Sequence, residues 1–189
     1  AVDRDTAEEA LSLIKLEYEE LPAFFDLTAA LSPGAIAIHE ETPGNNSVTR
    51  KIAYGDLDAA FARADYVRAD VFDLQSVSHA YLEPCSSIAQ SDTQGRITLI
   101  ASTQTPYILQ CLLASALGLR ENDVRIIKPA VGGGFGGKME LRSWDVCAAF
   151  IARLTGKPVK FTLTREEEFV AGRRRHGVHI RSRVGFKKD

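Results

Sequence analysis

One short segment of the sequence has a composition that suits ligand binding. Between Val131 and Glu140 the chain reads VGGGFGGKME, with five glycines from Gly132 to Gly137 that are interrupted only by Phe135. Each glycine in ordered structure costs roughly 0.5–1 kcal/mol relative to alanine, so such a run is typical of a backbone that something approaches closely. We therefore expect a ligand at this loop.

The first anion-binding alternative is a nucleotide-binding P-loop. Gly132, Gly137 and Lys138 fit the spacing GxxxxGK, in which backbone N–H groups hold phosphates. The next residue is Met139, however, where a P-loop needs the hydroxyl group of Ser or Thr for magnesium. The missing hydroxyl group argues against a P-loop.

A dinucleotide-binding loop is the second alternative. Gly132, Gly134 and Gly137 fit GxGxxG, but that motif needs an acidic residue about 20 positions later, at the end of the next strand. This interval falls in the helix predicted after the loop, and the acidic cluster 166–168 lies too far along the chain. A further alternative needs no ligand: a tight turn that lets a helix pack closely.

The elements on both sides of the loop must position it. An apolar strand at 124–131 leads into the loop, and a helix at 140–156 follows and ends at Gly156. Together with the other predicted strands and helices they give an α+β protein with mixed sheets and packed helices. The others are a helix at 57–64, a strand at 66–75, a hairpin with arms 86–90 and 96–102, a helix at 106–118 capped by Thr105, and strands at 158–164 and 179–186.

The first part of the chain differs from the rest. A helix that starts near Thr6 and a strand at 15–21 have no earlier strand to pair with, so the chain is expected to begin inside a domain. Residues 31–50 contain two Pro-Gly pairs and are expected to be a linker. Residues 1–30 are therefore predicted to end an α/β domain, and 51–189 to form most of a second domain.

Composition excludes several classes of function. The chain is 45% hydrophobic and 25% charged with a formal net charge of -2, which fits a globular protein without a basic excess for nucleic acid. The run Arg173–Arg175 is expected to be a solvated face. No stretch reaches the ~20 apolar residues of a membrane span and no signal peptide is recognisable, so a cytoplasmic location is expected. Cys85, Cys111 and Cys147 form no CxxC pattern and are expected to be reduced core thiols.

Three motifs together resemble one enzyme family. GGGFGGK at 132–138, SHAYLEP at 78–84 and STQTP at 102–106 are similar, in the same order, to motifs of the molybdenum-binding subunit of the xanthine dehydrogenase, aldehyde oxidase and carbon monoxide dehydrogenase family. Residues 5–26 resemble the end of that subunit's first, hammerhead-like domain, and 174–186 resemble the segment after its glycine loop. Three ordered motifs are far more specific than one glycine loop.

The resemblance implies a molybdenum cofactor and further protein parts. In this family a molybdopterin carries the metal, whose oxo, sulfido and hydroxo ligands hydroxylate an electron-poor carbon, and electrons leave through iron–sulfur clusters and usually FAD. The implied partners are the remaining molybdenum-binding domain, iron–sulfur and flavin subunits and a small-molecule substrate, with no nucleic acid and no membrane. No direct protein ligand to the metal is expected.

The matched motifs carry implied roles for individual residues. Gln104 matches the glutamine whose side-chain amide approaches a molybdenum oxygen, and it is the implied catalytic residue; its alternative is a buried amide that serves the backbone. Phe135 and Gly136 match the loop segment whose N–H groups face the metal centre, although Phe135 alone would also fit a core aromatic residue. The glycines whose missing Cβ lets a cofactor come close are Gly133, Gly134 and Gly137.

Met139 departs from the family pattern. Purine-oxidising members carry a glutamate directly after the loop lysine, whereas a thioether neither accepts a strong hydrogen bond nor carries charge. Glu140 comes one position late and on a helix would point about 100° away. The substrate pocket at Met139 is therefore expected to take an aldehyde, an aromatic heterocycle or an aryl thioester instead of xanthine.

Four residues with titratable side chains receive a structural interpretation. His79 with Glu83, and His176 with His179, are predicted to be hydrogen-bonded structural pairs, because neither pair has the further ligands that a metal needs. No chemistry at the cofactor is assigned to them.

The length of the chain sets a final expectation. The family's subunit has several hundred residues, and its catalytic glutamate base and second molybdenum-binding domain follow the matched segment. The chain is thus expected to be a fragment, a trimmed version or one piece of a split subunit, and to be inactive in isolation. The alternative from another class is a non-catalytic binding or assembly module that uses the loop for another anion or for packing.

Overall fold

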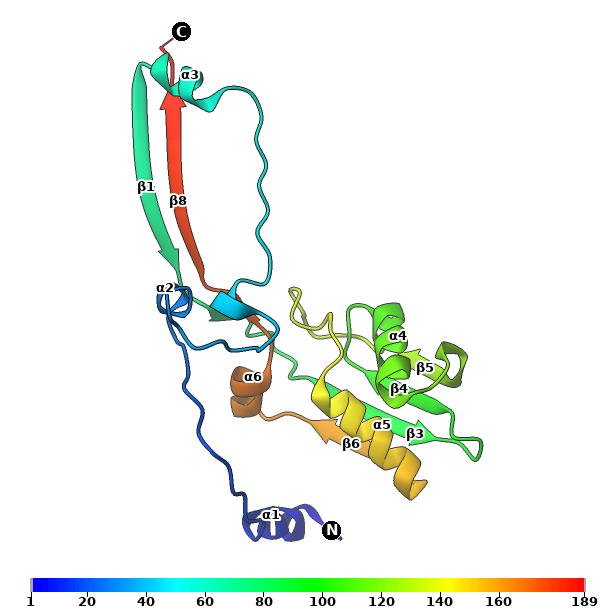
Figure 1. Cartoon of the computed structure of the whole chain (residues 1–189). Coiled ribbons are helices and arrows are strands. Elements are labelled where there is room, and N and C mark those ends of the chain that lie inside the picture. Colours follow the sequence, from blue (N-terminus) through cyan, green and yellow to red (C-terminus); the bar gives the residue numbers. More distant parts are fainter. Residues whose placement is uncertain (1, 189) are drawn as a thin grey trace. The chain divides into compact units, whose positions relative to one another are not determined.

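The computed structural model describes residues 2–188 (Figure 1). Contacts between Cα atoms divide the chain into Ala1–Asp70 with Arg181–Asp189, here unit 1, and Val71–Ile180, here unit 2. All three sequence motifs lie in unit 2. No helix within residues 2–188 combines the length and the apolar character that crossing a membrane requires. The domain limits 1–30, 31–50 and 51–189 stay a prediction.

Short helices begin at aspartates in unit 1. The side chains of Asp3, Asp26 and Asp56 each accept a backbone N–H group from the first turn of the helix that follows, which satisfies a donor that the helix itself leaves free. Asp3 therefore caps the first helix, which begins before the predicted Thr6. The elements are α1 (Arg4–Ser12), α2 (Leu27–Ala30), the 3-10 helix η1 (Pro43–Asn45) and α3 (Leu57–Ala62), followed by β1 (Tyr66–Leu74), which pairs with β8 (Val178–Phe186).

The strand predicted at 15–21 is wrong. Residues 14–26 have no regular secondary structure, and the side chains of Leu16 and Tyr18 are exposed. An alternating pattern alone does not make a strand, because the backbone N–H and C=O groups of a strand need a neighbouring strand. None of the described strands pairs with this segment.

A four-stranded mixed sheet forms the centre of unit 2. Its strands are β3 (Ser86–Ser91), β4 (Ile97–Ala101), β5 (Val124–Ile127) and β6 (Val159–Thr162). In the order β5–β4–β3–β6, β3 runs antiparallel to β4 and β6, and β4 runs parallel to β5. The predicted hairpin and the mixed α+β class are confirmed. The parallel pairing also confirms that the strands before Gln104 and before the glycine loop lie side by side.

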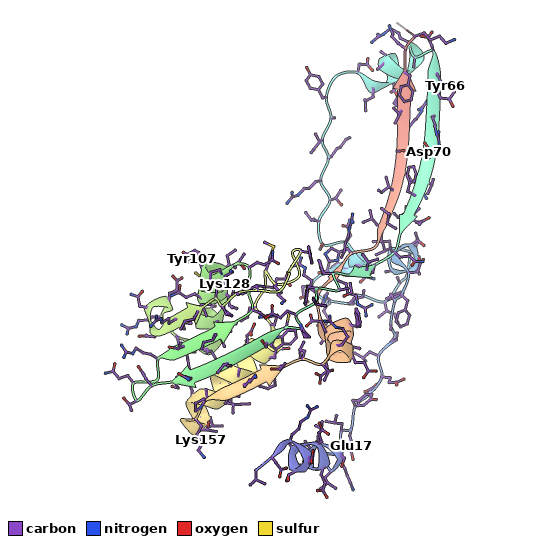
Figure 2. All side chains as sticks on the ribbon, turned by 180° about the vertical axis from the view of Figure 1, so that it is seen from behind. Glu17, Tyr66, Asp70, Tyr107, Lys128 and Lys157 are labelled. Atoms are coloured by element: carbon purple, nitrogen blue, oxygen red, sulfur yellow. The ribbon has the colours of Figure 1, made fainter. Side chains whose placement is uncertain are left out.

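Two helices bury the apolar face of this sheet. Helix α4 (Pro106–Leu117) packs on β5, and α5 (Ser143–Thr155) packs on β3, β6 and α4 (Figure 1). Leu109 and Leu113 from α4 join Leu99 from the sheet in one fully buried cluster. Ala148 and Ala149 of α5 complete the cluster, and their small side chains let this helix approach the sheet closely. The opposite face of α4 is exposed, with Tyr107 at the surface (Figure 2).

Both helices end where the sequence predicts. Gly118 and Gly156 have φ angles of 64° and 66°, a left-handed conformation that glycine adopts without a Cβ clash. The predicted start of α5 is wrong, since that helix begins at Ser143. The predicted start of α4 at Pro106 is confirmed, but the side chain of Thr105 does not cap this helix. The Thr105 hydroxyl instead donates to the Met139 carbonyl at 2.8 Å, so a contact distant in sequence replaces the local cap.

Several short elements are missing from the sequence-based prediction, including α2, η1 and the 3-10 helix η2 (Glu121–Asp123). Strands β2 (Val77–Ser78) and β7 (Arg174–Arg175) pair antiparallel, but each is too short to show an alternating pattern. Helix α6 (Arg165–Ala171) begins with a capping box between Thr164 and Glu167, a local signal that could have revealed it.

The three cysteines are free, but only one is a core thiol. Cys85 is buried, Cys111 is half-buried and Cys147 is exposed. The expectation that all three cysteines are core thiols is therefore wrong for Cys147. This residue lies on the outer face of α5, next to the buried Ala148.

Truncation of Leu109 is expected to destabilise unit 2. The residue is 0% exposed, and Leu→Ala at a buried site costs about 2–5 kcal/mol, because apolar contacts are lost and a cavity remains. The free energy of unfolding of Leu109→Ala, measured by urea denaturation, should fall by that amount. Leu112→Ala on the same helix, where the side chain is 43% exposed, should cost less than about 1 kcal/mol. Equal losses in the two variants would contradict the core described above.

Candidate functional site

The glycine loop contains a tight turn with an exposed aromatic residue. The Gly137 N–H donates to the Gly134 carbonyl at 2.7 Å, and the two central residues, Phe135 and Gly136, have φ angles of 48° and 87°. Two positive φ angles are typical of a type I′ turn, in which a residue other than glycine is strained by roughly 1–2 kcal/mol. Phe135 is 74% exposed, so it is not a core aromatic residue. Strain of this kind is common at functional sites.

The side chain of Gln104 lies directly on this turn. Its Oε1 atom accepts the N–H of Gly136 at 3.0 Å and that of Lys138 at 3.2 Å, while its own backbone N–H donates to the Lys138 carbonyl at 2.8 Å. A Cβ on Gly134 would lie 2.5 Å from Oε1, so only glycine leaves room for this contact. The structure thus brings the predicted site residues together. The Gly136 N–H, expected to face a cofactor, here donates to Gln104.

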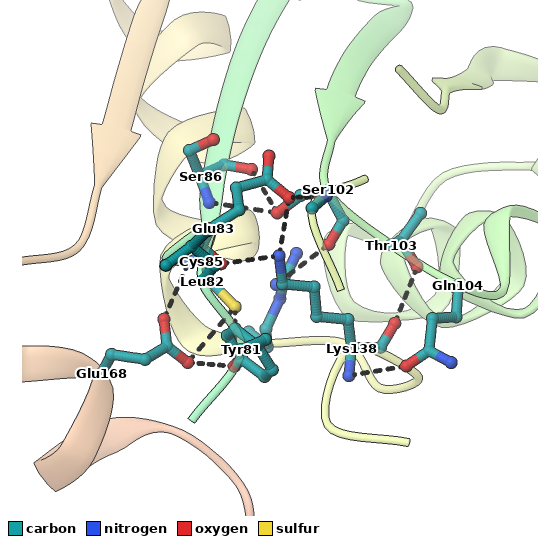
Figure 3. A network of polar contacts seen from close by, with 12 residues as sticks. Tyr81, Leu82, Glu83, Cys85, Ser86, Ser102, Thr103, Gln104, Lys138 and Glu168 are labelled. Atoms are coloured by element: carbon teal, nitrogen blue, oxygen red, sulfur yellow. Dashed lines mark hydrogen bonds and ion pairs between the residues drawn. The ribbon is translucent and has the colours of Figure 1, made fainter. Parts of the chain in front are cut away.

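Lys138 is buried and fastens the loop to the segment 78–84 (Figure 3). Its Nζ atom donates to the Glu83 carbonyl at 2.9 Å and to Glu83 Oε2 at 2.8 Å, and it lies 4.5 Å from the centre of the Tyr81 ring. Glu83 Oε2 also accepts the Gly132 N–H at 2.7 Å. Because the Lys138 ammonium group is already paired with Glu83, it is not available to bind a phosphate. The geometry therefore agrees with rejecting the P-loop.

Close packing explains why other loop positions are glycine. A Cβ on Gly132 would lie 2.6 Å from the Glu83 Cβ, and one on Gly137 would lie 2.9 Å from atoms of His79 and Tyr81. Real Cβ atoms do not come so close to such atoms, so larger residues would push the segments apart. The structure therefore supports close packing as one reason for the glycine run. The packing partner is the segment 78–84 and not the following helix.

The predicted pairing of His79 with Glu83 is wrong. Glu83 pairs with Lys138, whereas His79 Nδ1 lies 3.2 Å from the Arg173 carbonyl. Burial works against the charged form of Glu83, but the hydrogen bonds from Lys138 and Gly132 outweigh it and lower the pKa of this carboxyl group. Glu83 is therefore a structural anion at neutral pH.

Glu168 is a buried carboxylate that sequence reasoning missed. It accepts hydrogen bonds from the Tyr81 hydroxyl and from the Cys85 N–H, the latter at 2.7 Å (Figure 3). Burial first, and then the contacts with Cys85 and Glu168, raise the pKa of Tyr81, so its hydroxyl remains a donor. Glu168 lies in α6, and this network ties that helix to the motif at 78–84. The only feature of the sequence that pointed to Glu168 was the acidic cluster 166–168.

An open hollow of about 610 Å³ lies beside the turn. Phe135, Gly136 and Met139 line it together with residues 77–79 and 173–176. Arg173–Arg175 are exposed, as predicted, but they face this hollow and are more than a solvated surface. Met139 lines the hollow, and its place in a substrate pocket stays a prediction.

Two further interpretations of charged residues change with the structure. His176 lines the hollow, and His179 Nδ1 contacts Asp73 Oδ1 at 2.5 Å, so the predicted pairing of the two histidines is wrong. His176 directly follows β7, and His179 lies in β8. Their partners depend on tertiary contacts and not on their spacing in the sequence. Glu140 forms an ion pair with Arg173, which neither spacing nor composition predicts.

Comparisons with known proteins agree with the motifs. A family model described as a molybdopterin cofactor-binding domain matches residues 38–189. The nicotinate dehydrogenase large molybdopterin subunit of Eubacterium barkeri is 37% identical over 185 residues, which cover 98% of this chain and 43% of that protein. The xanthine dehydrogenase molybdenum-binding subunit of Escherichia coli O157:H7 is 35% identical over 189 residues, 100% of this chain and 25% of that protein.

A solved structure extends the similarity to the fold. The crystal structure of quinoline 2-oxidoreductase from Pseudomonas putida 86 matches with a TM-score of 0.88 at 30% identity, covering 99% of this chain and 24% of that chain. The chain therefore spans less than half the length of each of these relatives.

Replacement of Lys138 by methionine is expected to destabilise the loop. The change leaves the Glu83 carboxylate and carbonyl without their shared donor, and losing hydrogen bonds to a charged group at a largely buried site costs about 2–3 kcal/mol. Urea denaturation should show this loss. Lys160→Met on the exposed side of β6 is the control and should change the free energy of unfolding by less than about 0.5 kcal/mol. Equal effects would show that the buried pair is not special.

Acidification is expected to remove the contribution of Glu83. Its pKa is lower in the folded chain than its ordinary value of 4.5, so the stabilisation is complete above that value and is lost as the pH falls through the folded pKa. The unfolding free energies of the unchanged chain and of Glu83→Gln should therefore differ most near pH 7 and converge below pH ~4.5. A difference that stays constant from pH 7 to pH ~3 would contradict this role.

Proposed function

This chain belongs to the family of molybdopterin cofactor-binding domains, and we propose that it forms part of the catalytic subunit of a molybdenum hydroxylase-type oxidoreductase. The names of its relatives support this, since they describe large, molybdenum-binding subunits of dehydrogenases. Because the chain spans only part of each relative, the activity is proposed for the assembled enzyme and not for the chain alone. A second molybdenum-binding domain, iron–sulfur and flavin partners and a cytoplasmic location belong to the same proposal.

The residues on the open side of the loop fit a cofactor rich in oxygen acceptors. Within residues 2–188, Gln104 Nε2 and the Phe135 N–H have no hydrogen-bond partner, and both residues are exposed. A Cβ on Gly136 would meet nothing within 4 Å, so the turn is open there. A bound molybdenum cofactor supplies the oxidation of an electron-poor carbon and the electron transfer that follows. The contribution of this chain is to hold donors at fixed positions.

The single observation that carries the proposal is the orientation of Gln104. Two N–H groups of the loop, from Gly136 and Lys138, hold its Oε1 atom, so the Nε2 end must point away from them. An amide does not titrate, so this donor is present at every pH at which the protein is folded. A fixed donor that stabilises a charged oxygen avoids the cost of reorganising at the moment of reaction.

Residues 133–137 have two kinds of role in this proposal: some shape and pack the loop, and others form its open side. Gly134 and Gly137 act through packing, because a Cβ at either position would strike another segment. Gly133, with a φ angle of 93°, shapes the backbone beside the Phe135 ring. Packing within this chain does not account for the exposed, strained Phe135 or for the open side of Gly136. A purely structural loop would have no need of them.

The proposed substrates are small electron-poor molecules. Met139 gives the hollow an uncharged thioether, which favours an aldehyde, an aromatic heterocycle or an aryl thioester over a purine that needs a carboxylate. The named substrates of two relatives, nicotinate and quinoline, are aromatic heterocycles. We therefore place an aromatic heterocycle first among these classes.

Gln104→Glu tests the proposed donor without removing its acceptor. The carboxylate keeps an oxygen for the N–H groups of Gly136 and Lys138 but lacks the Nε2 donor. In the assembled enzyme we expect kcat for an aromatic heterocycle to fall about 100-fold, as for the loss of one donor to a developing charge, with the molybdenum content unchanged. Steady-state kinetics and elemental analysis measure the two quantities.

Two further variants complete this test. Gln94→Glu, in an exposed turn of the β3–β4 hairpin, repeats the chemical change away from the loop and should leave kcat unchanged. Gln104→Ala removes acceptor and donor together, so it should lower both kcat and the stability of the loop. Full kcat in Gln104→Glu, at normal molybdenum content, would remove Gln104 from the proposed site.

A further inference from the structure

A basic wall lines one side of the hollow beside the glycine loop. Arg173, Arg174 and Arg175 line it together with His79 and His176, and no Asp or Glu within residues 2–188 does so. A guanidinium group keeps its charge throughout the pH range in which proteins fold. The wall is therefore positive whatever the charge of the histidines.

Backbone contacts hold this wall in place. Strand β7 carries two of the arginines and pairs with β2, with Ser78 opposite Arg174 and Val77 opposite Arg175. The Ser76 hydroxyl adds a hydrogen bond to the Arg175 carbonyl at 2.9 Å. These contacts use the backbone of Arg175 and leave its side chain exposed.

The charge of the wall is only partly neutralised. Arg173 forms an ion pair with Glu140, while Arg174 Nη2 donates to the Phe169 carbonyl at 2.6 Å, which is a neutral partner. Among the described residues, Arg174 and Arg175 form no ion pair. An anion that enters the hollow therefore meets guanidinium groups whose charge no carboxylate balances.

The other side of the hollow is apolar. Phe135 is 74% exposed and Met139 is 42% exposed, so both residues are available for contact. Aromatic rings and thioethers both pack well on a flat aromatic ligand. The volume of about 610 Å³ lies within the range that small-molecule sites occupy.

We propose that this hollow selects a substrate that joins an aromatic ring to a carboxylate, with the ring against Phe135 and Met139 and the carboxylate on Arg175. The inference rests on the proposed function and names the substrate class for that site. The phosphate of a pterin cofactor is also an oxyanion that a guanidinium group can bind. The apolar side favours the substrate, because a phosphate alone would leave Phe135 and Met139 without a partner.

The test compares anionic and neutral ligands of the same shape in the assembled enzyme. Benzoate and benzamide are titrated by calorimetry, and kcat/KM is measured for pyridine-3-carboxylate and pyridine-3-carboxamide. The unchanged enzyme should bind benzoate at least about 10-fold more tightly than benzamide, as a charge-assisted hydrogen bond provides. Arg175→Gln should remove most of this preference, and Arg175→Lys should retain part of it.

Matched variants separate this role from a general loss of charge. Arg125→Gln changes an exposed arginine on β5 away from the hollow and should keep the preference for benzoate. Met139→Glu brings a carboxylate into the hollow and should weaken benzoate binding without a similar effect on benzamide. The same pattern should hold for kcat/KM of the two pyridines.

Three outcomes would overturn the inference. Equal affinities for benzoate and benzamide in the unchanged enzyme would do so, and this titration needs no turnover. An unchanged preference in Arg175→Gln would do so as well. A loss of molybdenum and pterin from Arg175→Gln would assign the wall to the cofactor phosphate. Failure of the proposed function is distinct, since it would show as absent molybdenum or absent turnover of both pyridines in the unchanged enzyme.

Discussion

The buried ammonium group of Lys138 is the interaction on which the site depends. A charge that is 0% exposed is tolerated only when its hydrogen bonds are satisfied, and Glu83 satisfies it with both its carboxylate and its carbonyl. The backbone of the same lysine holds Gln104, through the carbonyl on one side and the N–H on the other. One residue therefore fixes the glycine loop against two other segments of unit 2.

The shape of the loop follows from this anchoring. Since the lysine draws the chain towards the segment 78–84, Gly132 and Gly137 must pass within contact distance of its side chains, where a Cβ would not fit. The turn between them then carries Phe135 outwards, into solvent and towards the hollow. Inward groups of the loop serve packing, and outward groups remain free for a ligand. The strain at Phe135 is offset by the contacts of its neighbours.

Local signals predict most of the fold of unit 2, whereas pairings between distant segments escape sequence reasoning. The hairpin, the helix ends at Gly118 and Gly156 and the parallel strand before the loop all rest on nearby residues. The strand expected at 15–21 and the pair of His79 with Glu83 fail, because a strand and a carboxylate take their partners from the whole fold. Neither the spacing nor the composition of the sequence indicated that Lys138 would be buried.

The three motifs that resemble the family are one structural unit. Glu83 from the first motif pairs with Lys138 from the third, and Gln104 from the second lies on the turn of the third. Each motif therefore limits what the others can be: a Cβ on Gly134 would displace Gln104, and loss of Lys138 would leave Glu83 without its cation. Their joint occurrence follows from this packing, which makes the three matches a single geometric observation. That geometry is what holds the donor of Gln104 at the edge of the loop, so the structural and the proposed catalytic roles of these residues cannot be separated.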